Sequence, residues 1–476
     1  MDDLGISPRG SMGEYLTHVA KERTCLSLTL RRPPRPSIAA LKANSTLIRK
    51  QHSPLLENEI SPYLTVEGAI ECINGNNFSN IVEMAAIIEN CANSNQRMLD
   101  KLVGSEELAL ELVSALSNDA FQDFYKVHVM EIICSLFATS NIMSENYVDN
   151  GLTMSIIDMI QSESTTITSS TLTLIRQTSG VAYVKDSMLT FGLPDYLIEF
   201  LSNTTDPSII EEACVALCSI FHNVDEVDST VLEEFITKLE PLLDLEVPNG
   251  VRAIITAYIS ITDQQPMLIH NAYDAGIPNK IIQLIPIETL TGACLILLAN
   301  FCHFHPIQVN TLLEAGLIDI LLQIIENSPQ AGGAFAIFSN LIESVTSQVI
   351  EVCKPLIHFS VEMTKSCSFE TKKEIVYFIC TYVLYSSASN IKDIVNEEIY
   401  EIVIEMLGCS IPIIINRCLD ALQKIATVLE DFVLDVDSCI IDDLFDALDS
   451  LSQSNIKSIA KHAIYISNRL QKLHTV

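Results

Sequence analysis

One glycine-centred motif recurs along this chain at a nearly constant spacing. The tripeptides N-G-L, F-G-L, A-G-I and A-G-L contain Gly151, Gly192, Gly276 and Gly316, so the steps are 41, 84 and 40 residues, and 84 is two steps of 42. An apolar stripe with helical spacing follows each glycine. A period in this range predicts stacked helical repeats, because each repeat can bury its apolar face only against its neighbours.

The helical pattern begins at Thr65 and continues to the end of the chain. Each later unit opens in a turn-prone stretch and leads into a long apolar helix, followed by two further helices with a left-handed glycine turn between them. The expected unit starts are Phe124, Thr166, Pro207, Val247, Thr289, Ser328, Ser368, Cys409 and Ser454. Three helices per unit predict an all-α, right-handed armadillo-repeat superhelix, an α-solenoid of about ten repeats over residues 61–476.

Charge is distributed unevenly along the sequence. Residues 1–52 contain nine Lys or Arg and four Asp or Glu, a net charge of +5, whereas the other residues contain nineteen basic and fifty-six acidic residues, a net charge of −37. Prolines punctuate residues 1–60, so we expect this segment to be a basic, largely disordered arm. An acidic body attracts cationic partners and repels nucleic acid, so we expect no direct nucleic-acid binding.

The remaining composition favours a reduced intracellular protein. The fourteen cysteines are scattered through apolar helical stripes, and no apolar signal region precedes them. The longest apolar stretch, near 293–301, is far too short to span a membrane. We therefore expect a soluble protein of the cytoplasm and nucleus that has no membrane partner.

No catalytic or metal-binding constellation stands out. C-H-F-H at 302–305 supplies too few ligands for a tetrahedral metal site, and no second cluster completes it. Gly332 and Gly333 lack the Lys-Ser/Thr that follows them in a phosphate loop. We expect no enzyme activity, no metal and no cofactor.

Several sequence segments are more specific than the repeat period. S-P-L-L-E-N-E at 53–59 with T-V-E-G-A-I-E-C-I-N-G-N-N at 65–77, T-K-K-E-I-V-Y-F-I at 371–379, and L-D-A-L-Q-K-I at 419–425 resemble the importin-α (karyopherin-α) family. The stretch 444–470 is similar to that family's atypical last repeat. With the basic arm and the repeat order, the resemblance extends over essentially the whole chain.

The resemblance implies a nuclear import adaptor. In that family a basic nuclear localisation signal lies extended in a groove, where W-x-x-x-N pairs on the third helices clamp its backbone and stack on its lysines. By that register, the cargo-peptide groove of this chain contains Asn300, Asn340, Tyr377 and Thr381. Asn300 and Asn340 could instead be structural amides, and Tyr377 could be an aromatic that packs between repeats.

The second to fifth repeats depart from the family pattern. Trp is absent from the chain, and the pairs at the family's Trp and Asn positions are Glu131 and Ser135, Leu172 and Arg176, Val215 and Ser219, and Ile254 and Tyr258. Only the later repeats keep asparagines and an aromatic. The resemblance therefore predicts a weakened or altered cargo preference.

The basic arm resembles the family's importin-β-binding segment in position and sign. The basic residues assigned to that contact are Arg23, Arg31, Arg32, Arg35, Lys42, Arg49 and Lys50. The hypothesis is an adaptor that binds basic cargo in its groove and an importin-β-like receptor through its arm. The alternative is a non-transport armadillo scaffold for protein–protein interaction.

Overall fold

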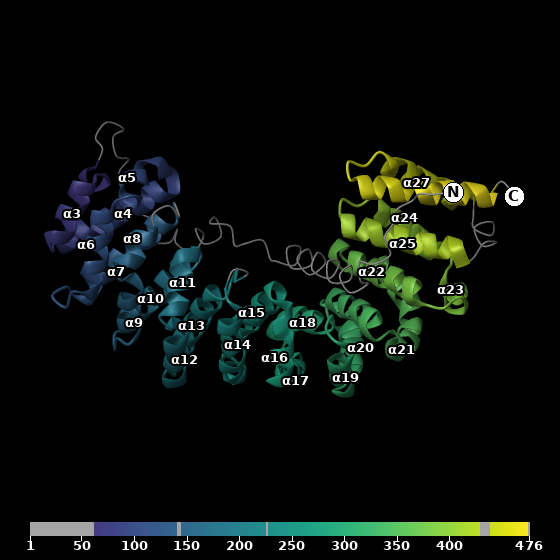
Figure 1. Cartoon of the computed structure of the whole chain (residues 1–476), viewed down its shortest axis with the longest axis horizontal. Helices are drawn as coiled ribbons and strands as arrows, with labels where there is room; N and C mark the ends of the chain where they lie inside the picture. Colours follow the sequence, from purple (N-terminus) through teal and green to yellow (C-terminus); the bar gives the residue numbers. More distant parts are fainter. Residues whose placement is uncertain (1–60, 140–143, 225–226, 429–437, 475–476) are drawn as a thin grey trace, which may run out of the picture. The chain divides into compact units, whose positions relative to one another are not determined.

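The computed structural model describes residues 61–139, 144–224, 227–428 and 438–474. Within these ranges every regular element is an α-helix or a short 3-10 helix, and no strand occurs (Figure 1). The described chain divides into two compact units, residues 61–271 and 272–474. The predicted all-α class is confirmed, whereas the predicted arm, residues 1–60, lies outside the described residues.

Unit 61–271 alternates long helices with pairs of shorter ones. The long helices are α4 (Phe78–Ser94), α7 (Asp123–Phe137), α10 (Thr165–Thr178), α13 (Pro207–Ile220) and α15 (Pro248–Gln264). The shorter α-helices are α3 (Val66–Asn74), α5 (Asp100–Val103), α6 (Glu106–Ser117), α8 (Ser144–Asp149), α9 (Leu152–Ile160), α11 (Ala182–Thr190), α12 (Leu193–Asn203) and α14 (Ser229–Lys238), and α16 (Ile269–Asp274) spans the boundary between the two units. Four 3-10 helices, Pro62–Leu64, Gln96–Leu99, Glu240–Asp244 and Pro266–Leu268, complete the unit.

Unit 272–474 follows the same plan. Its long helices are α18 (Glu288–Phe301), α21 (Ala331–Thr364), α22 (Phe369–Tyr385), α25 (Pro412–Val428) and α27 (Lys457–His474). Its shorter helices are α17 (Ile277–Leu284), α19 (Pro306–Glu314), α20 (Leu317–Asn327), α23 (Ala388–Ile394) and α24 (Glu397–Leu407), and α26 (Ser438–Ser452) precedes α27. The second half of α21 continues beyond a kink at Val345, where φ is −135° and ψ is 45°.

The long helices pack directly on one another within each unit. In 61–271 the contacts run in order from α4 through α7, α10 and α13 to α15, and in 272–474 from α18 through α21, α22 and α25 to α27. The shorter helices α9, α12 and α14 lie along one edge of their stack, and the long helices lie along the other (Figure 1). The predicted starts of the long helices agree with the observed ones to within three residues, from Asp123 to Lys457.

The recurring glycines make the turn that their spacing predicts. Gly151, Gly192, Gly276 and Gly316 have φ values of 89°, 71°, 74° and 83°, and each stands directly before one of the short helices α9, α12, α17 and α20. In this left-handed region a side chain is strained, and only glycine enters it without cost. The left-handed turn predicted from the sequence is confirmed.

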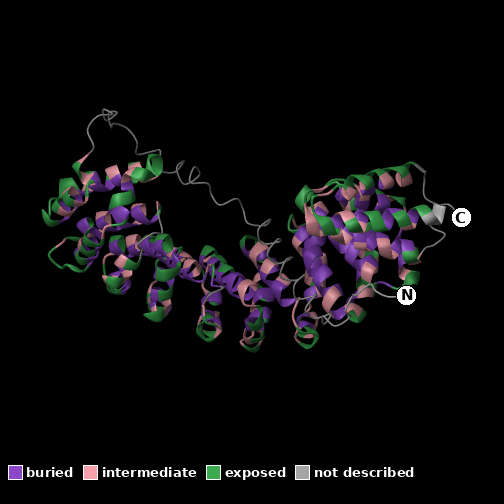
Figure 2. Cartoon of the chain, turned by 45° about the horizontal axis from the view of Figure 1, so that its top comes forward, coloured by how far each residue is buried: buried purple, intermediate pink, exposed green. Residues whose placement is uncertain are grey.

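Apolar side chains fill the space between the helices. Figure 2 shows buried residues along the stacked helices and exposed residues at the outer ends of the short ones. The largest fully buried side chains include Tyr258, Phe335 and Phe378. Burying an aliphatic or aromatic side chain of this size contributes about 1.5–3 kcal/mol, so the stack is held together chiefly by its apolar core.

Ion pairs between neighbouring repeats join residues that are about one repeat length apart in the sequence. Lys238 Nζ lies 2.6 Å from Asp195 Oδ1, and Lys354 Nζ lies 2.6 Å from Asp393 Oδ2. The thirteen cysteines among the described residues are free thiols. Burial raises the pKa of Cys214 and Cys294 to about 12, so both stay protonated and unreactive at neutral pH.

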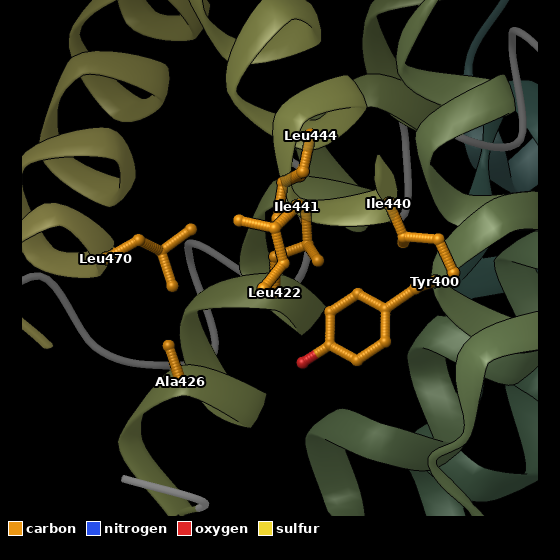
Figure 3. Close-up of a pocket in the computed structure, with 7 residues that line it drawn as sticks. All are labelled: Tyr400, Leu422, Ala426, Ile440, Ile441, Leu444 and Leu470. Carbon is orange, nitrogen blue, oxygen red and sulfur yellow. The ribbon is translucent and has the colours of Figure 1, made fainter. Parts of the chain in front are cut away.

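The last repeat is closed by an apolar cluster. Side chains from α24, α25, α26 and α27 converge on a small pocket (Figure 3), lined by Tyr400, Leu422, Ala426, Ile440, Ile441, Leu444 and Leu470. Among these described residues no carboxylate, amide or thiol faces the pocket. It is therefore core that seals the end of the stack rather than a site for a polar ligand.

Candidate functional site: the inner row of the long helices

The faces of the long helices that neighbouring helices leave uncovered form a row, here called the inner row. In unit 61–271 its members are at least partly accessible, and they are Phe124, His128 and Glu131 on α7, Ser169, Thr173 and Arg176 on α10, Glu212 and Ser219 on α13, and Asn249, Arg252 and Thr256 on α15. Hydrogen bonds join successive helices along this row. Ser169 Oγ donates to Glu212 Oε2 at 2.6 Å, and Asn249 Nδ2 donates to Glu211 Oε2 at 3.1 Å.

An exposed aromatic cluster lies at the beginning of this row. Phe78 on α4 and Phe124 on α7 are 49% and 54% exposed, and their ring centroids are 4.9 Å apart. The His128 ring lies edge-on to Phe124 at 5.2 Å, and its Nδ1 lies 2.6 Å from Glu131 Oε2. The exposed parts of these rings and the exposed Glu131 carboxylate, two helical turns further along α7, can hold cationic side chains by cation–π and ionic contacts.

The two predicted asparagine clamps are buried. Asn300 and Asn340 are 6% and 4% exposed. Asn340 Nδ2 donates to Ala299 O of the preceding long helix at 2.8 Å, so this amide joins α21 to α18. Its Oδ1 is buried without a partner among the described residues, which leaves an acceptor that a water or a peptide N–H would satisfy. The role of both residues in binding a peptide stays a prediction.

Tyr377 and Thr381 are also buried, at 2% and 0% exposure. The guanidinium carbon of Arg417 lies over the Tyr377 ring, 4.6 Å from its centroid. Arg417 also donates a hydrogen bond to Tyr377 Oη. The ring that was predicted to stack on a peptide lysine thus already carries a cation, supplied by the next repeat.

The two residues at the family's Trp and Asn positions in the fifth repeat lie in the core. Ile254 and Tyr258 on α15 were placed at the family's Trp and Asn positions, but both are fully buried. Tyr258 Oη donates to Ile236 O at 2.7 Å, which fixes the ring in the core. Arg252 and Thr256 of the same helix are exposed.

Sequence reasoning missed the residues that distinguish the two units. Phe124 and Glu131 are seven residues apart, a spacing that places both on one face of α7. Arg417 follows Tyr377 by 40 residues, the repeat stride itself. Either spacing could have been noticed, but neither indicates which side chains remain exposed. The residues assigned to importin-β binding, from Arg23 to Lys50, lie outside the described residues.

Sites of other kinds are weak or absent in the described part of the chain. No group of three or more His, Cys, Asp or Glu residues could hold a metal ion there. Within the same ranges no single helix is long and apolar enough to cross a membrane. One bent pair of helices, Pro306–Glu314 and Leu317–Asn327, would be long and apolar enough if its two members were combined.

Comparisons with known proteins support the fold. No family model matches the sequence, and no curated protein sequence matches it. An engineered protein of known crystal structure is similar over 87% of this chain and 99% of its own, with a TM-score of 0.65 and 15% identity. A designed armadillo-repeat protein aligns over 49% of this chain and 99% of its own, with a TM-score of 0.43 and 16% identity.

A second designed armadillo-repeat protein, solved in complex with the peptide (KR)4, aligns over 51% of this chain and 100% of its own, with a TM-score of 0.43 and 14% identity. At such identities only the fold follows, and the match over 87% of the chain carries that conclusion. Together with three helices per repeat and the left-handed glycine turns, it defines the chain as an all-α armadillo-repeat solenoid.

Proposed function

We propose that this chain is a protein-binding armadillo-repeat protein whose inner row in unit 61–271 binds an extended, cationic segment of a partner. The observation that carries the proposal is the exposed pair of rings, Phe78 and Phe124, together with the exposed carboxylate of Glu131 two helical turns further along α7. Two large aromatic side chains about half exposed on adjacent long helices are the kind of surface that a partner covers. No such pair would be needed for the packing of the stack.

The charge of the chain supports a cationic partner. Outside residues 1–52 the net charge is −37, so a basic segment is attracted over distances that a neutral one is not. Stacking a lysine or arginine on Phe124 contributes about 0.5–1 kcal/mol at an exposed site, and several such contacts along one extended segment add up. A row of small contacts is the binding mode that a solenoid offers.

The finer form of this proposal is a nuclear import adaptor that resembles importin-α. It is supported by the basic arm on an acidic body and by the sequence segments that resemble that family. In this form the cargo has a basic signal, the arm binds an importin-β-like receptor, and the protein moves between cytoplasm and nucleus. The chain has no catalytic role in this proposal.

The alternative is a scaffold outside nuclear transport, and a specific observation favours it. The amide nitrogen of Asn340 donates a hydrogen bond to Ala299 O, and Arg417 covers the Tyr377 ring. Two of the positions that would clamp a transport signal are thus engaged within the chain. A scaffold keeps the open row in 61–271 without that second site.

Peptide binding tests the coarser proposal. A lysine-rich peptide should bind the full chain, and its affinity should fall as ionic strength rises, because exposed charges are screened by salt. Phe124→Ala and Glu131→Gln should each weaken binding about three- to ten-fold. Fluorescence anisotropy of a labelled peptide measures the affinity.

The matched control for this test is Phe359→Ala. Phe359 is 42% exposed on the second half of α21, so this substitution removes a ring of comparable exposure from the other unit. Its affinity should equal that of the wild-type chain. Unchanged binding by Phe124→Ala would refute the aromatic site.

Receptor capture separates the adaptor from the scaffold. Purified importin-β should retain the full wild-type chain and lose the variant in which Arg31, Arg32 and Arg35 are all replaced by alanine. A variant with the same three changes still carries the whole repeat stack, so its peptide binding acts as the control for folding. A wild-type chain that importin-β does not retain would leave the scaffold as the function.

A further inference from the structure

The contact between Arg417 and Tyr377 belongs to a three-helix arrangement. Glu343 lies on α21, Tyr377 on α22 and Arg417 on α25, which are successive long helices of unit 272–474. Arg417 Nη2 lies 2.8 Å from Glu343 Oε1 and also donates to Tyr377 Oη. One guanidinium therefore joins three consecutive repeats.

The arrangement is largely removed from water. The side chains of Arg417 and Glu343 are 12% and 11% exposed, and Tyr377 is 2% exposed. Removing a charged pair from water is costly, so a buried guanidinium is retained only where its carboxylate, its hydroxyl contact and its ring face are all in place. The Tyr377 ring and the Glu343 carboxylate supply those groups.

These features are those of a cation-binding site. A ring face, a phenol oxygen and a carboxylate that converge on one point are complementary to a planar guanidinium, with stacking on one side and hydrogen bonds at the edge. By comparison, Arg469 and Tyr465 pair within α27 at 3.4 Å between Nη1 and Oη, but Tyr465 is 50% exposed and solvent surrounds the pair. Burial and the carboxylate distinguish the Arg417 site.

We propose that Glu343 and Tyr377 form a guanidinium-binding site which the chain fills with its own Arg417, so that Arg417 is an internal ligand that excludes external cations from this site. Removing the side chain of Arg417 should leave a site that binds a small guanidinium compound. The inference does not depend on the proposed function, because the probe binds whether or not the chain binds a peptide.

Chemical rescue of the full chain tests the proposal, with ethylguanidinium as the probe. Arg417→Ala should be less stable to heat than the wild type, and low millimolar ethylguanidinium should raise its melting temperature in a saturable way. Its affinity for the probe should exceed that of the wild-type chain about ten-fold or more, because the site is vacant only in the variant. Calorimetric titration measures the affinity directly.

Two further variants test which groups form the site. Arg417→Met removes the charge but keeps an apolar stem in the space, so the probe should not rescue it. Arg417→Ala combined with Tyr377→Leu should lose the binding that Arg417→Ala alone acquires. Should Arg417→Ala not give a folded chain, Arg417→Gln is measured in its place against the same partners.

Arg469→Ala is the matched control. It removes an arginine that pairs with a tyrosine in solvent, and it should acquire no affinity for ethylguanidinium. Equal binding of the probe by Arg469→Ala and Arg417→Ala, or no binding by a folded Arg417→Ala chain, would overturn the proposal. Retention of binding after Tyr377→Leu would do the same.

Discussion

The inner row is open in one unit and occupied in the other. In 61–271 Phe78, Phe124 and Glu131 are about half exposed. In 272–474 the corresponding side of the long helices has Asn340 bonded to Ala299 and Tyr377 covered by Arg417. The backbone stride is shared by both units. The difference shows that side chains alone decide whether a repeat offers its inner face to a partner or uses it to join neighbouring repeats.

The largest expected effect comes from the buried aromatic contacts of unit 272–474. Phe378 on α22 is fully buried, and its ring centroid lies 5.3 Å from that of Phe335 on α21. Phe378→Ala should lower the free energy of unfolding of this unit by about 3–5 kcal/mol, since it leaves a cavity between two repeats. Denaturant unfolding followed by hydrogen exchange in α22 measures the loss.

Phe78→Ala is the matched change in the open unit. The Phe78 ring makes a similar aromatic contact but is about half exposed, so its removal should cost about 0.5 kcal/mol or less. Equal losses at both positions would break the distinction between a binding row and a packed one. A loss confined to Phe378 would sharpen it.

A smaller effect is expected from the internal cation of unit 61–271. Lys185 on α11 is 4% exposed, and its Nζ donates to His222 O and to Asn223 O, the latter at 2.8 Å. Lys185→Met should cost about 1–3 kcal/mol, because both carbonyls lose a buried donor. Thermal unfolding measures the cost, and hydrogen exchange near 222–224 should increase with it.

Lys238→Met is the control for this change. Lys238 pairs with Asp195 and Glu234 at a more exposed position, where ion pairs contribute less than about 1 kcal/mol. If the two lysine variants lost equal stability, the buried Lys185 would contribute no more to the free energy of unfolding than an exposed lysine does. The internal cation would then be a feature of unit 272–474 alone.

The smallest expected effect is a pH dependence in unit 272–474. Burial raises the pKa of Asp420 on α25 above its usual value of 3.8, although His462 and Arg417 oppose this shift. The folded state therefore takes up a proton at a pH where the unfolded chain is still ionised, so the contribution of Asp420 to stability increases as the pH falls toward 3.8. Asp420→Asn should remove this dependence.

At neutral pH Asp420→Asn should stabilise the unit by less than about 1 kcal/mol, because 46% of the carboxyl side chain is exposed and solvent screens it. Melting temperatures measured between about pH 4 and about pH 7 give the slope of stability against pH. A variant with the same slope as the wild type would assign the pH dependence to another group.

The glycine spacing and the apolar stripes were sufficient to predict the helices. The long helices begin within three residues of their predicted positions because each start depends on local signals, such as the caps Asp206 and Ser368 and the apolar period that follows them. The predicted turns at Gly151 and its counterparts are local in the same sense. These features need no knowledge of the neighbouring repeat.

The site was less predictable than the fold. Ile254 and Tyr258 were placed at the family's Trp and Asn positions, and both are buried, whereas Arg252 and Thr256 on the same helix are exposed. The sequence alone does not show which side of a helix is exposed where apolar residues extend around most of its circumference. Tyr377 was predicted to stack on a lysine of a bound peptide, and in the structure the cation over its ring is Arg417 of the chain itself.

The sequence by itself determined the all-α class, the repeat stride and the glycine turns, because helix signals and left-handed glycines act over a few neighbouring residues. Only the tertiary structure decided which faces stay open and which are joined. Whether Phe124 is exposed or Tyr377 is covered depends on side chains about 40 residues away in the chain, which meet only when one repeat packs on the next.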